Sequence, residues 1–256
     1  MQKLLAYPLS VLYLMAFSLA LLVFHPVQWV CYTLFGYEAH RKSVALLNLC
    51  LMRTTLFLGT TYRFENPYDL PTDRPLIIVP NHQSMHDIPP LIWFMRKWHP
   101  KFVSKSELGK GIPSVSYNLR HGGSVLINRK DGRQSLNEIA KLGRYIEEHN
   151  RSAVIFPEGT RSLTGHPKPF KVIGLKVLMK NAPSALVVPI SINNSWKMLR
   201  YGKFPNGIGN HIGFKVHQAI EVTNNLDAVI ASTENAVVSG ITSFATKSQI
   251  NDATDA

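Results

Sequence analysis

The chain has 256 residues, of which 45% are hydrophobic and 17% charged, a balance that excludes a disordered chain. It carries 28 Lys+Arg against 16 Asp+Glu, so its formal net charge is +12, and its two Cys residues exclude a disulfide scaffold and a Cys-based zinc module. Residues 96–180 hold 17 of the basic residues but only 6 of the acidic ones. Such a stretch is expected where a face meets phosphate groups, an acidic lipid surface or nucleic acid, although a merely solvated basic surface is the alternative.

The N-terminal region contains no Asp, Glu, Lys or Arg between residues 4 and 37. A helix over Leu4–Phe24 would be about 31 Å long, close to the hydrocarbon thickness of a bilayer. A cleaved signal peptide is the alternative, but the sequence stays apolar after the possible cleavage site at Ala20. We expect His25-Pro26 to break the helix. The uncharged stretch is too short for two full spans, so a single span with an interfacial tail and a re-entrant hairpin both remain open.

A second apolar helix is predicted over Ser43–Gly59. Arg53 near its centre favours a helix that lies on the membrane or packs against it rather than one that crosses it. Together with Arg41 and Lys42, Arg53 outweighs Lys3, and the positive-inside rule then predicts that the rest of the chain lies on the cytoplasmic face of the inner membrane.

Beyond this membrane segment of residues 1–60, β-rich runs alternate with helical stretches, which predicts one α/β domain over residues 61–250. The expected strands are Thr61–Glu65, Leu76–Pro80, Lys101–Ser104, Ser124–Asn128, Ala153–Phe156, Ala185–Ile192 and Ile212–Val222. The expected helices are Asp87–Lys97, Arg133–His149, Val172–Lys180 and Leu226–Lys247. Asp131 is a plausible N-cap for the second of these helices.

Polar residues follow the apolar strand that ends at Pro80, in the segment Asn81–Asp87. The end of a buried strand just before a helix is where an open α/β sheet usually places its site. His82 and Asp87 are five positions apart, so the carboxylate can fold back onto the imidazole, fix its tautomer and stabilise its charged form. Taken alone, such a pair is more often a structural hydrogen bond than a catalytic dyad.

A second polar segment, Phe156–Ser162, also follows an apolar strand. Its glycine, Gly159, permits close backbone approach, Thr160 and Ser162 offer hydroxyls, and Arg161 offers a planar fork suited to phosphate. Basic residues lie between the two segments: Lys101, Lys105, Lys110, Arg129 and Lys130. Together these groups would surround a candidate proton acceptor with phosphate-binding side chains.

Four segments in this order resemble the motifs of the glycerolipid acyltransferases, and most closely the 1-acyl-glycerol-3-phosphate acyltransferase group. The motifs are His82 with four residues to Asp87, then Gly123-x-x-Leu126-Ile127-x-Arg129, then Phe156–Ser162, then Val188-Pro189-Ile190. The resemblance covers roughly residues 75–192. It implies a mixed sheet flanked by helices, with N-terminal helices embedded in the membrane.

The resemblance also implies a function, which is acyl transfer from a thioester to the free hydroxyl of a lysophospholipid, giving phosphatidic acid when the acceptor is 1-acyl-glycerol-3-phosphate. No cofactor is expected, and acyl-CoA or an acyl-carrier-protein thioester would be the co-substrate. The expected partners are thus the two substrates and membrane lipids, with acyl carrier protein as a further partner if it carries the thioester, and no nucleic acid.

Roles for individual residues follow from the same resemblance. His82 would act as the general base on the acceptor hydroxyl, oriented by Asp87. Arg129 would bind the acceptor phosphate, assisted by Lys105 and Arg161. The remaining residues assigned to substrate binding are Glu158 and Gly159 at the glycerol region, Thr160 beside them, and Pro189 on the acyl-donor side.

Other readings of the pattern remain. Another lysolipid could be the acceptor. The i, i+4 spacing of His82 and His86 could also hold a metal in a membrane enzyme, but the other histidines are scattered, and we interpret His86 as a structural residue with no metal bound. A basic membrane-binding or nucleic-acid-binding protein would explain the charge but not the polar segments at two strand ends.

Overall fold

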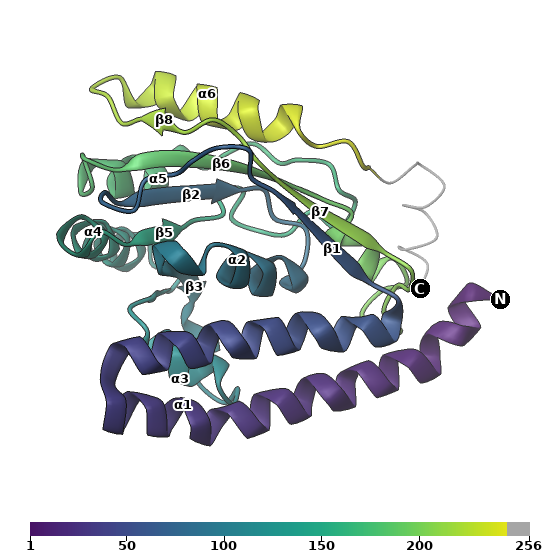
Figure 1. The fold of residues 1–256 in the computed structure, drawn as a ribbon. Helices are drawn as coiled ribbons and strands as arrows, with labels where there is room; N and C mark the ends of the chain where they lie inside the picture. The colour runs from purple at the N-terminus through teal and green to yellow at the C-terminus, as the bar shows by residue number, and fades with distance from the viewer. Residues whose placement is uncertain (245–256) are drawn as a thin grey trace.

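The computed structural model describes residues 1–244, and a twisted sheet between two helical layers organises them (Figure 1). One layer contains α4 (Gly132–His149), α5 (Val172–Lys180) and α6 (Leu226–Ser239), of which α6 lies above the sheet in Figure 1. The other contains α1 (Gln2–Thr54), α2 (Ile88–Phe94) and α3 (Val115–His121). The expected mixed sheet flanked by helices is confirmed.

The sheet has the strand order β1-β7-β6-β2-β5-β3-β4, and β8 pairs with β6. Its strands are β1 (Thr61–Glu65), β2 (Leu76–Pro80), β3 (Pro100–Lys105), β4 (Val125–Ile127), β5 (Ser152–Val154), β6 (Leu186–Asn193), β7 (His211–Val216) and β8 (Ile220–Glu221). Pairing is parallel except where β6 meets β7 and β8. The carboxyl ends of β2, β3, β4, β5 and β6 therefore lie along one edge.

The central strand β2 is buried over its whole length, and its alternate side chains feed two separate cores. Ile77 and Val79 pack with α4, α5 and α6 on one face. Leu76 and Ile78 pack with α2 and with the N-terminal helix on the other. This two-sided burial explains the continuous apolar sequence of the strand, because a parallel strand covered on both faces has no polar side.

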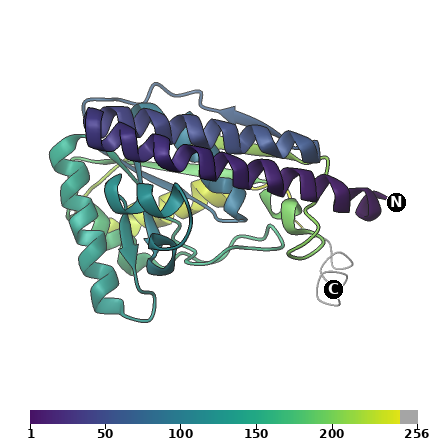
Figure 2. The same ribbon diagram turned by 90° about the horizontal axis from the view of Figure 1, so that it is seen from below.

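The N-terminal helix folds back on itself at Gly36, so the prediction of a break at His25-Pro26 was wrong. Gly36 has φ 75° and ψ −163°, a conformation essentially restricted to glycine, whereas Pro26 lies within the helix. A helix in apolar surroundings tolerates proline, because unwinding there would leave further backbone groups without hydrogen-bond partners. Residues 2–35, here the first arm, and residues 37–54, the second arm, lie side by side (Figure 2).

Both arms are attached to the α/β domain. The second arm lies against α2 (Figure 1), while the first arm contributes Tyr13 to the core beneath the sheet. Ser10 of the first arm accepts the backbone N–H of Asn206 at 2.8 Å, and Leu21 accepts the hydroxyl of Ser114 at 2.6 Å. The uncharged stretch is thus one continuous helix up to the bend, and the hairpin pairs it with the helix that was predicted over Ser43–Gly59. Whether the stretch spans a membrane or re-enters it stays a prediction.

Several predicted elements differ from the observed ones. The run Ile212–Val222 is divided into β7 and β8, and the helix expected from Leu226 ends at Ser239, although residues 245–247 of that prediction lie outside the described part of the chain. The following residue is Gly240, where a Cβ would clash with Ser191. A short helix, α3, was not predicted at all. The side chain of Asp131 accepts from Gln134 N at 2.9 Å, which confirms it as the N-cap of α4.

Candidate active site

Residues from four neighbouring loops gather at the carboxyl edge of the sheet. His82 follows β2, Lys105 ends β3, Arg129 follows β4, and the segment 156–162 follows β5. These four strands are parallel neighbours, so their carboxyl ends meet at one edge, which is where open α/β sheets bind ligands. The two polar segments, Lys105 and Arg129 thus lie along the same edge, whereas Lys101, the second residue of β3, lies toward the other end of that strand.

His82 and Asp87 form a hydrogen-bonded pair at this edge. Nδ1 of His82 lies 2.8 Å from Oδ2 of Asp87. Asp87 is fully buried, whereas the His82 side chain keeps 14% of its surface exposed. When Nδ1–H donates to the carboxylate, Nε2 is the nitrogen with a free lone pair. The pair can therefore accept a proton at Nε2, and the carboxylate stabilises the imidazolium that results.

The backbone around Asp87 fixes its position. Oδ2 also accepts the N–H groups of Gln83 at 2.7 Å and of Ser84 at 2.9 Å. Ser84 Oγ in turn accepts the N–H of His86 at 3.0 Å. Ser84 and Asp87 form a capping box at the start of the 3₁₀ turn η2 (Met85–Asp87), which leads into α2. The turn at the start of the helix therefore brings the Asp87 carboxylate back to His82, five positions earlier in the chain.

The loop after β5 holds His82 from the other side. The rings of His82 and Phe156 stack with their centroids 4.1 Å apart. The backbone N–H of His82 donates to Oε1 of Glu158 at 3.1 Å, and the N–H of Ser162 donates to the carbonyl of His82 at 2.7 Å. Both polar groups of the His82 backbone are thus engaged by the second segment, and the imidazole is positioned by two loops.

Glu158, which accepts the backbone N–H of His82, is buried. Its Oε2 is buried and makes no hydrogen bond within residues 1–244. Burial raises the pKa of Glu158 to about 7, and the N–H of His82 opposes that shift only in part. Glu158 is thus a structural partner of the base, and its assignment to the glycerol region stays a prediction.

The titration of Glu158 is expected to make stability depend on pH. Its folded-state pKa of about 7 lies above the ordinary value of 4.5, so its contribution to stability is complete below pH 4.5 and is lost as the pH rises through 7. Calorimetry across this range should show a falling unfolding midpoint. Glu158→Gln should flatten that part of the profile, whereas Glu148→Gln, an exposed change on α4, should not. Identical profiles for all three proteins would refute the assignment.

Basic side chains flank the His82–Asp87 pair. Lys105, Arg129 and Arg161 are exposed at the ends of three adjacent strands. Partial burial lowers the pKa of Arg129, Glu107 opposes this, and the positive charge of Arg161 adds to the lowering, so Glu107 and Arg161 both lie within electrostatic range of Arg129. Arg161 also acts on His86, next to Asp87. An anion held here would lie beside the candidate base.

The other predicted site residues occupy distinct positions. Gly159 has φ 72°, and a Cβ there would lie 3.1 Å from the side chain of Lys171, so the turn needs glycine. Thr160 is exposed in the same turn. Pro189 lies inside β6, buried and in register with Val79 of β2, so it is part of the sheet rather than of the loops. Its role on the acyl-donor side stays a prediction.

His86 is turned away from His82. It is 3% exposed, and its Nε2 lies 3.0 Å from the hydroxyl of Tyr13 in the first arm. Burial lowers the pKa of His86 to about 4, so it is neutral near pH 7. His82 and His86 therefore do not converge on a common point, and within residues 1–244 no group of three or more His, Cys, Asp or Glu side chains is placed to hold a metal ion.

Three residues of this site were not given roles from the sequence. Tyr13 supports His86, Phe156 stacks on His82, and Glu107 acts on Arg129. Tyr13 was hidden within an apolar run, where a tyrosine is an ordinary residue. Phe156 and Glu107 each adjoin a recognised feature, but only the pairing of the strands shows which neighbour each one meets.

Comparison with known proteins agrees with this geometry. The family described as Acyltransferase matches residues 61–193. A 1-acyl-sn-glycerol-3-phosphate acyltransferase of Chlamydomonas reinhardtii is 31% identical over 171 residues, which cover 67% of this chain and 50% of that protein. The enzyme of the same name from Helicobacter pylori is 35% identical over 133 residues, 49% of this chain and 54% of that one. The chain thus spans about half the length of these curated relatives.

A solved structure shows the same fold. The 1-acyl-sn-glycerophosphate acyltransferase of Thermotoga maritima superimposes with a TM-score of 0.78 at 23% identity, covering 94% of this chain and 96% of that one. The family match includes both polar segments and the basic loop between them, since residues 61–193 run from β1 to the end of β6. By its sequence and its fold, the chain belongs to the acyltransferase family.

Proposed function

We propose that the protein transfers a fatty acyl group from an acyl thioester to the free hydroxyl of 1-acyl-glycerol-3-phosphate, forming phosphatidic acid. The observation that carries the proposal is the pairing of His82 with a buried carboxylate at the same sheet edge as two exposed arginines, Arg129 after β4 and Arg161 after β5. A base and an anion site at one edge match an acceptor that has both a hydroxyl and a phosphate. The names of the curated relatives support the same substrate.

The chemistry needs one base and no covalent intermediate with the enzyme. Nε2 of His82 accepts the hydroxyl proton as the acceptor oxygen attacks the thioester carbonyl carbon. Asp87 stabilises the imidazolium through the Nδ1–H hydrogen bond. When the tetrahedral intermediate collapses, the C–S bond breaks, and the thiolate leaves with the proton that His82 returns. Either acyl-CoA or acyl carrier protein would supply the thioester.

Arg129 is proposed to bind the acceptor phosphate, with Lys105 and Arg161 beside it. Arg129→Ala should raise the KM for 1-acyl-glycerol-3-phosphate by about 10-fold or more, because it removes a charge-assisted contact, and should change the KM for the acyl donor much less. Steady-state kinetics in detergent, with each substrate varied in turn, measure both constants. Arg133→Ala, an exposed change on α4, is the matched control.

Assays with a panel of lysolipids and both donor types would identify the preferred pair of substrates. An unchanged acceptor KM in both Arg129→Ala and Arg161→Ala would contradict the phosphate site. If the enzyme preferred a different lysolipid and Arg129→Ala still raised its KM, the phosphate site would stand and only the identity of the acceptor would change.

We also propose that the hairpin anchors the protein in the cytoplasmic face of the inner membrane. The first arm displays a continuous set of large apolar side chains to the outside, namely Leu4, Leu5, Val11, Leu12, Met15, Leu19, Leu22, Val23, Val27, Val30, Leu34 and Phe35. By length and composition α1 could cross a membrane. The first arm is hydrogen bonded to the domain at Ser10, Tyr13 and Leu21. These contacts favour a hairpin that lies along the membrane surface over one that crosses the membrane perpendicularly.

Membrane attachment can be tested on the exposed face of the first arm. The double change Leu19→Lys and Val23→Lys places two charges where the acyl chains would lie, and it should shift the protein from the vesicle-bound to the soluble fraction in a flotation assay. Val238→Lys on α6, on the opposite side of the sheet (Figure 1), is the control. Equal flotation of the double variant and the control would show that the first arm is not the anchor.

A further inference from the structure

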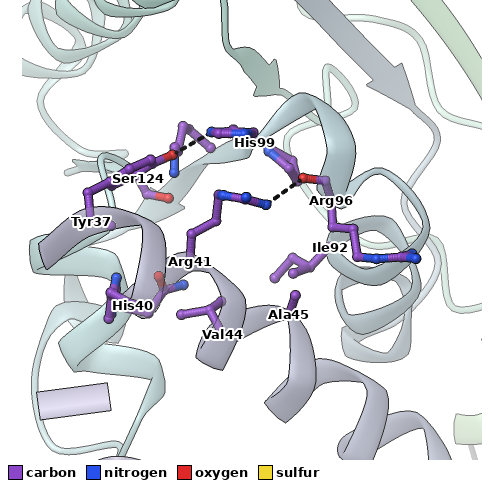
Figure 3. A pocket seen from close by; sticks show the side chains of 13 residues that line it. Tyr37, His40, Arg41, Val44, Ala45, Ile92, Arg96, His99 and Ser124 are labelled. Atoms are coloured by element: carbon purple, nitrogen blue, oxygen red, sulfur yellow. Dashed lines mark hydrogen bonds between the residues drawn. The ribbon is translucent and has the colours of Figure 1, made fainter. Parts of the chain in front are cut away.

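A pocket separate from the catalytic edge lies between the bend of the hairpin and the sheet (Figure 3). The polar residues that line it include Tyr37, Arg41, Arg96, His99, Lys101 and Ser124. Lys101 is the second residue of β3, whereas Lys105 at the catalytic edge is the last. At about 3.3 Å per residue, four residues separate the two sites by about 13 Å along the strand. The pocket is therefore at the amino-terminal edge of the sheet.

Lys101 is the most unusual side chain in this pocket. It is 5% exposed, and none of the ion pairs among residues 1–244 includes it. It lies 4.7 Å from the centre of the Tyr37 ring, and the guanidinium of Arg151 lies 3.8 Å from the centre of the same ring. Burial, together with the charges of Arg151 and Arg41, lowers the pKa of Lys101 to about 7, although Glu38 opposes the shift. A buried cation without a counter-charge is costly, so this site favours an anion.

Most of the charged side chains around Lys101 are cations. Arg41 is paired with Glu38 at 2.7 Å and also donates to the carbonyl of Arg96 at 3.2 Å (Figure 3). The guanidinium of Arg96 stacks on Trp93 at 4.1 Å and donates to the carbonyl of Trp93 at 2.7 Å, and it points away from Arg41 in Figure 3. Glu38 is the carboxylate that faces this group, and its side chain is 56% exposed. One solvated carboxylate does not neutralise Lys101, Arg41, Arg96 and Arg151.

We propose that this pocket binds the phosphate group of an anionic ligand, with Lys101 as its central cation and with a phospholipid headgroup as the ligand that its position favours. The pocket has a volume of about 30 Å³ and is partly open, so a phosphate oxygen can enter it while the rest of the phosphate lies at its mouth. Leu34 and Phe35, directly before the bend, are 70% and 69% exposed. A lipid could therefore place its headgroup in the pocket and its chains along the first arm.

The test is the thermal unfolding midpoint of the full chain in detergent, titrated with inorganic phosphate, with dihexanoyl phosphatidylglycerol or with dihexanoylglycerol, which has no phosphate. We expect saturating phosphatidylglycerol to raise the midpoint by about 5 °C and dihexanoylglycerol to leave it unchanged. Lys101→Met, which keeps the length of the side chain but removes its charge, should weaken binding by about 10-fold or more. Lys180→Met, an exposed change on α5, should not.

A second background separates this pocket from the catalytic edge. The stabilisation should persist in Arg129→Gln, because that change affects only phosphate bound near His82. Stabilisation by phosphatidylglycerol alone, or by phosphatidylglycerol and inorganic phosphate, supports the proposal and identifies the source of the phosphate. The proposal is overturned if neither compound stabilises the wild type, if Lys101→Met responds normally, or if Arg129→Gln removes the response. If Lys101→Met does not fold, a normal response of Arg96→Gln overturns it.

Discussion

His82→Ala is expected to lower the rate of acyl transfer by about 10²–10⁴-fold while leaving the fold intact, because a positioned base contributes a factor of this size. The imidazole is partly exposed, and the loop around it is held through backbone groups that alanine retains, namely the N–H to Glu158 and the carbonyl to Ser162. Turnover of 1-acyl-glycerol-3-phosphate with a labelled thioester donor, together with the circular dichroism spectrum, measures activity and folding.

The control for this variant is His149→Ala, which removes an exposed imidazole from the last turn of α4. It should keep full activity. Near-normal turnover by a folded His82→Ala protein would remove His82 from the role of base and would leave the His82–Asp87 hydrogen bond as a structural contact.

Replacing Asp87 should separate the electrostatic role of this residue from its structural one. All three of its hydrogen bonds are made by Oδ2, whereas Oδ1 has no partner within residues 1–244. In Asp87→Asn, an amide oxygen at the Oδ2 position can keep all three bonds while the negative charge is lost. We expect a loss of about 10²-fold or more in turnover, because the imidazolium is no longer stabilised, with a small loss of stability from the unpaired amide group.

Asp87→Ala removes the charge and the three hydrogen bonds together. It should therefore lose at least as much activity as Asp87→Asn and also lower the unfolding midpoint by several degrees, since two buried N–H groups lose their acceptor. Equal activity of Asp87→Asn and the wild type would show that charge is not needed. A larger loss of stability in Asn than in Ala would contradict the hydrogen-bond geometry.

The grouping of the loops that carry His82, Lys105, Arg129 and Arg161 at the carboxyl edge of the sheet could be predicted, because it depends on local sequence patterns. Polar residues after apolar strands, the spacing of His82 and Asp87, and the parallel strands expected from alternating β and α runs place these loops along one edge. The capping box at Ser84 and Asp87 is visible in the sequence for the same reason.

The bend of the hairpin could not be predicted, because the choice between Pro26 and Gly36 depends on what surrounds the helix. Proline is a strong helix breaker in water, but Pro26 lies in an apolar arm, and the fold-back occurs where the second arm can pack on α2. The contacts of Tyr13 and Lys101 were equally hidden. Each joins segments that only the tertiary structure brings together, and neither residue type is unusual at its place in the sequence.

The attachment of the first arm also has a consequence for the order of events during synthesis. Tyr13 finds His86 across 73 positions of sequence, Leu21 finds Ser114 across 93, and Ser10 finds Asn206 across 196. At about 5–20 residues per second, a ribosome needs roughly 10–40 s between making Ser10 and making its partner. The apolar first arm is thus made before the segments to which it docks. Throughout that interval a bilayer or a chaperone has to shield it, so translation near a membrane would protect the nascent chain from aggregation.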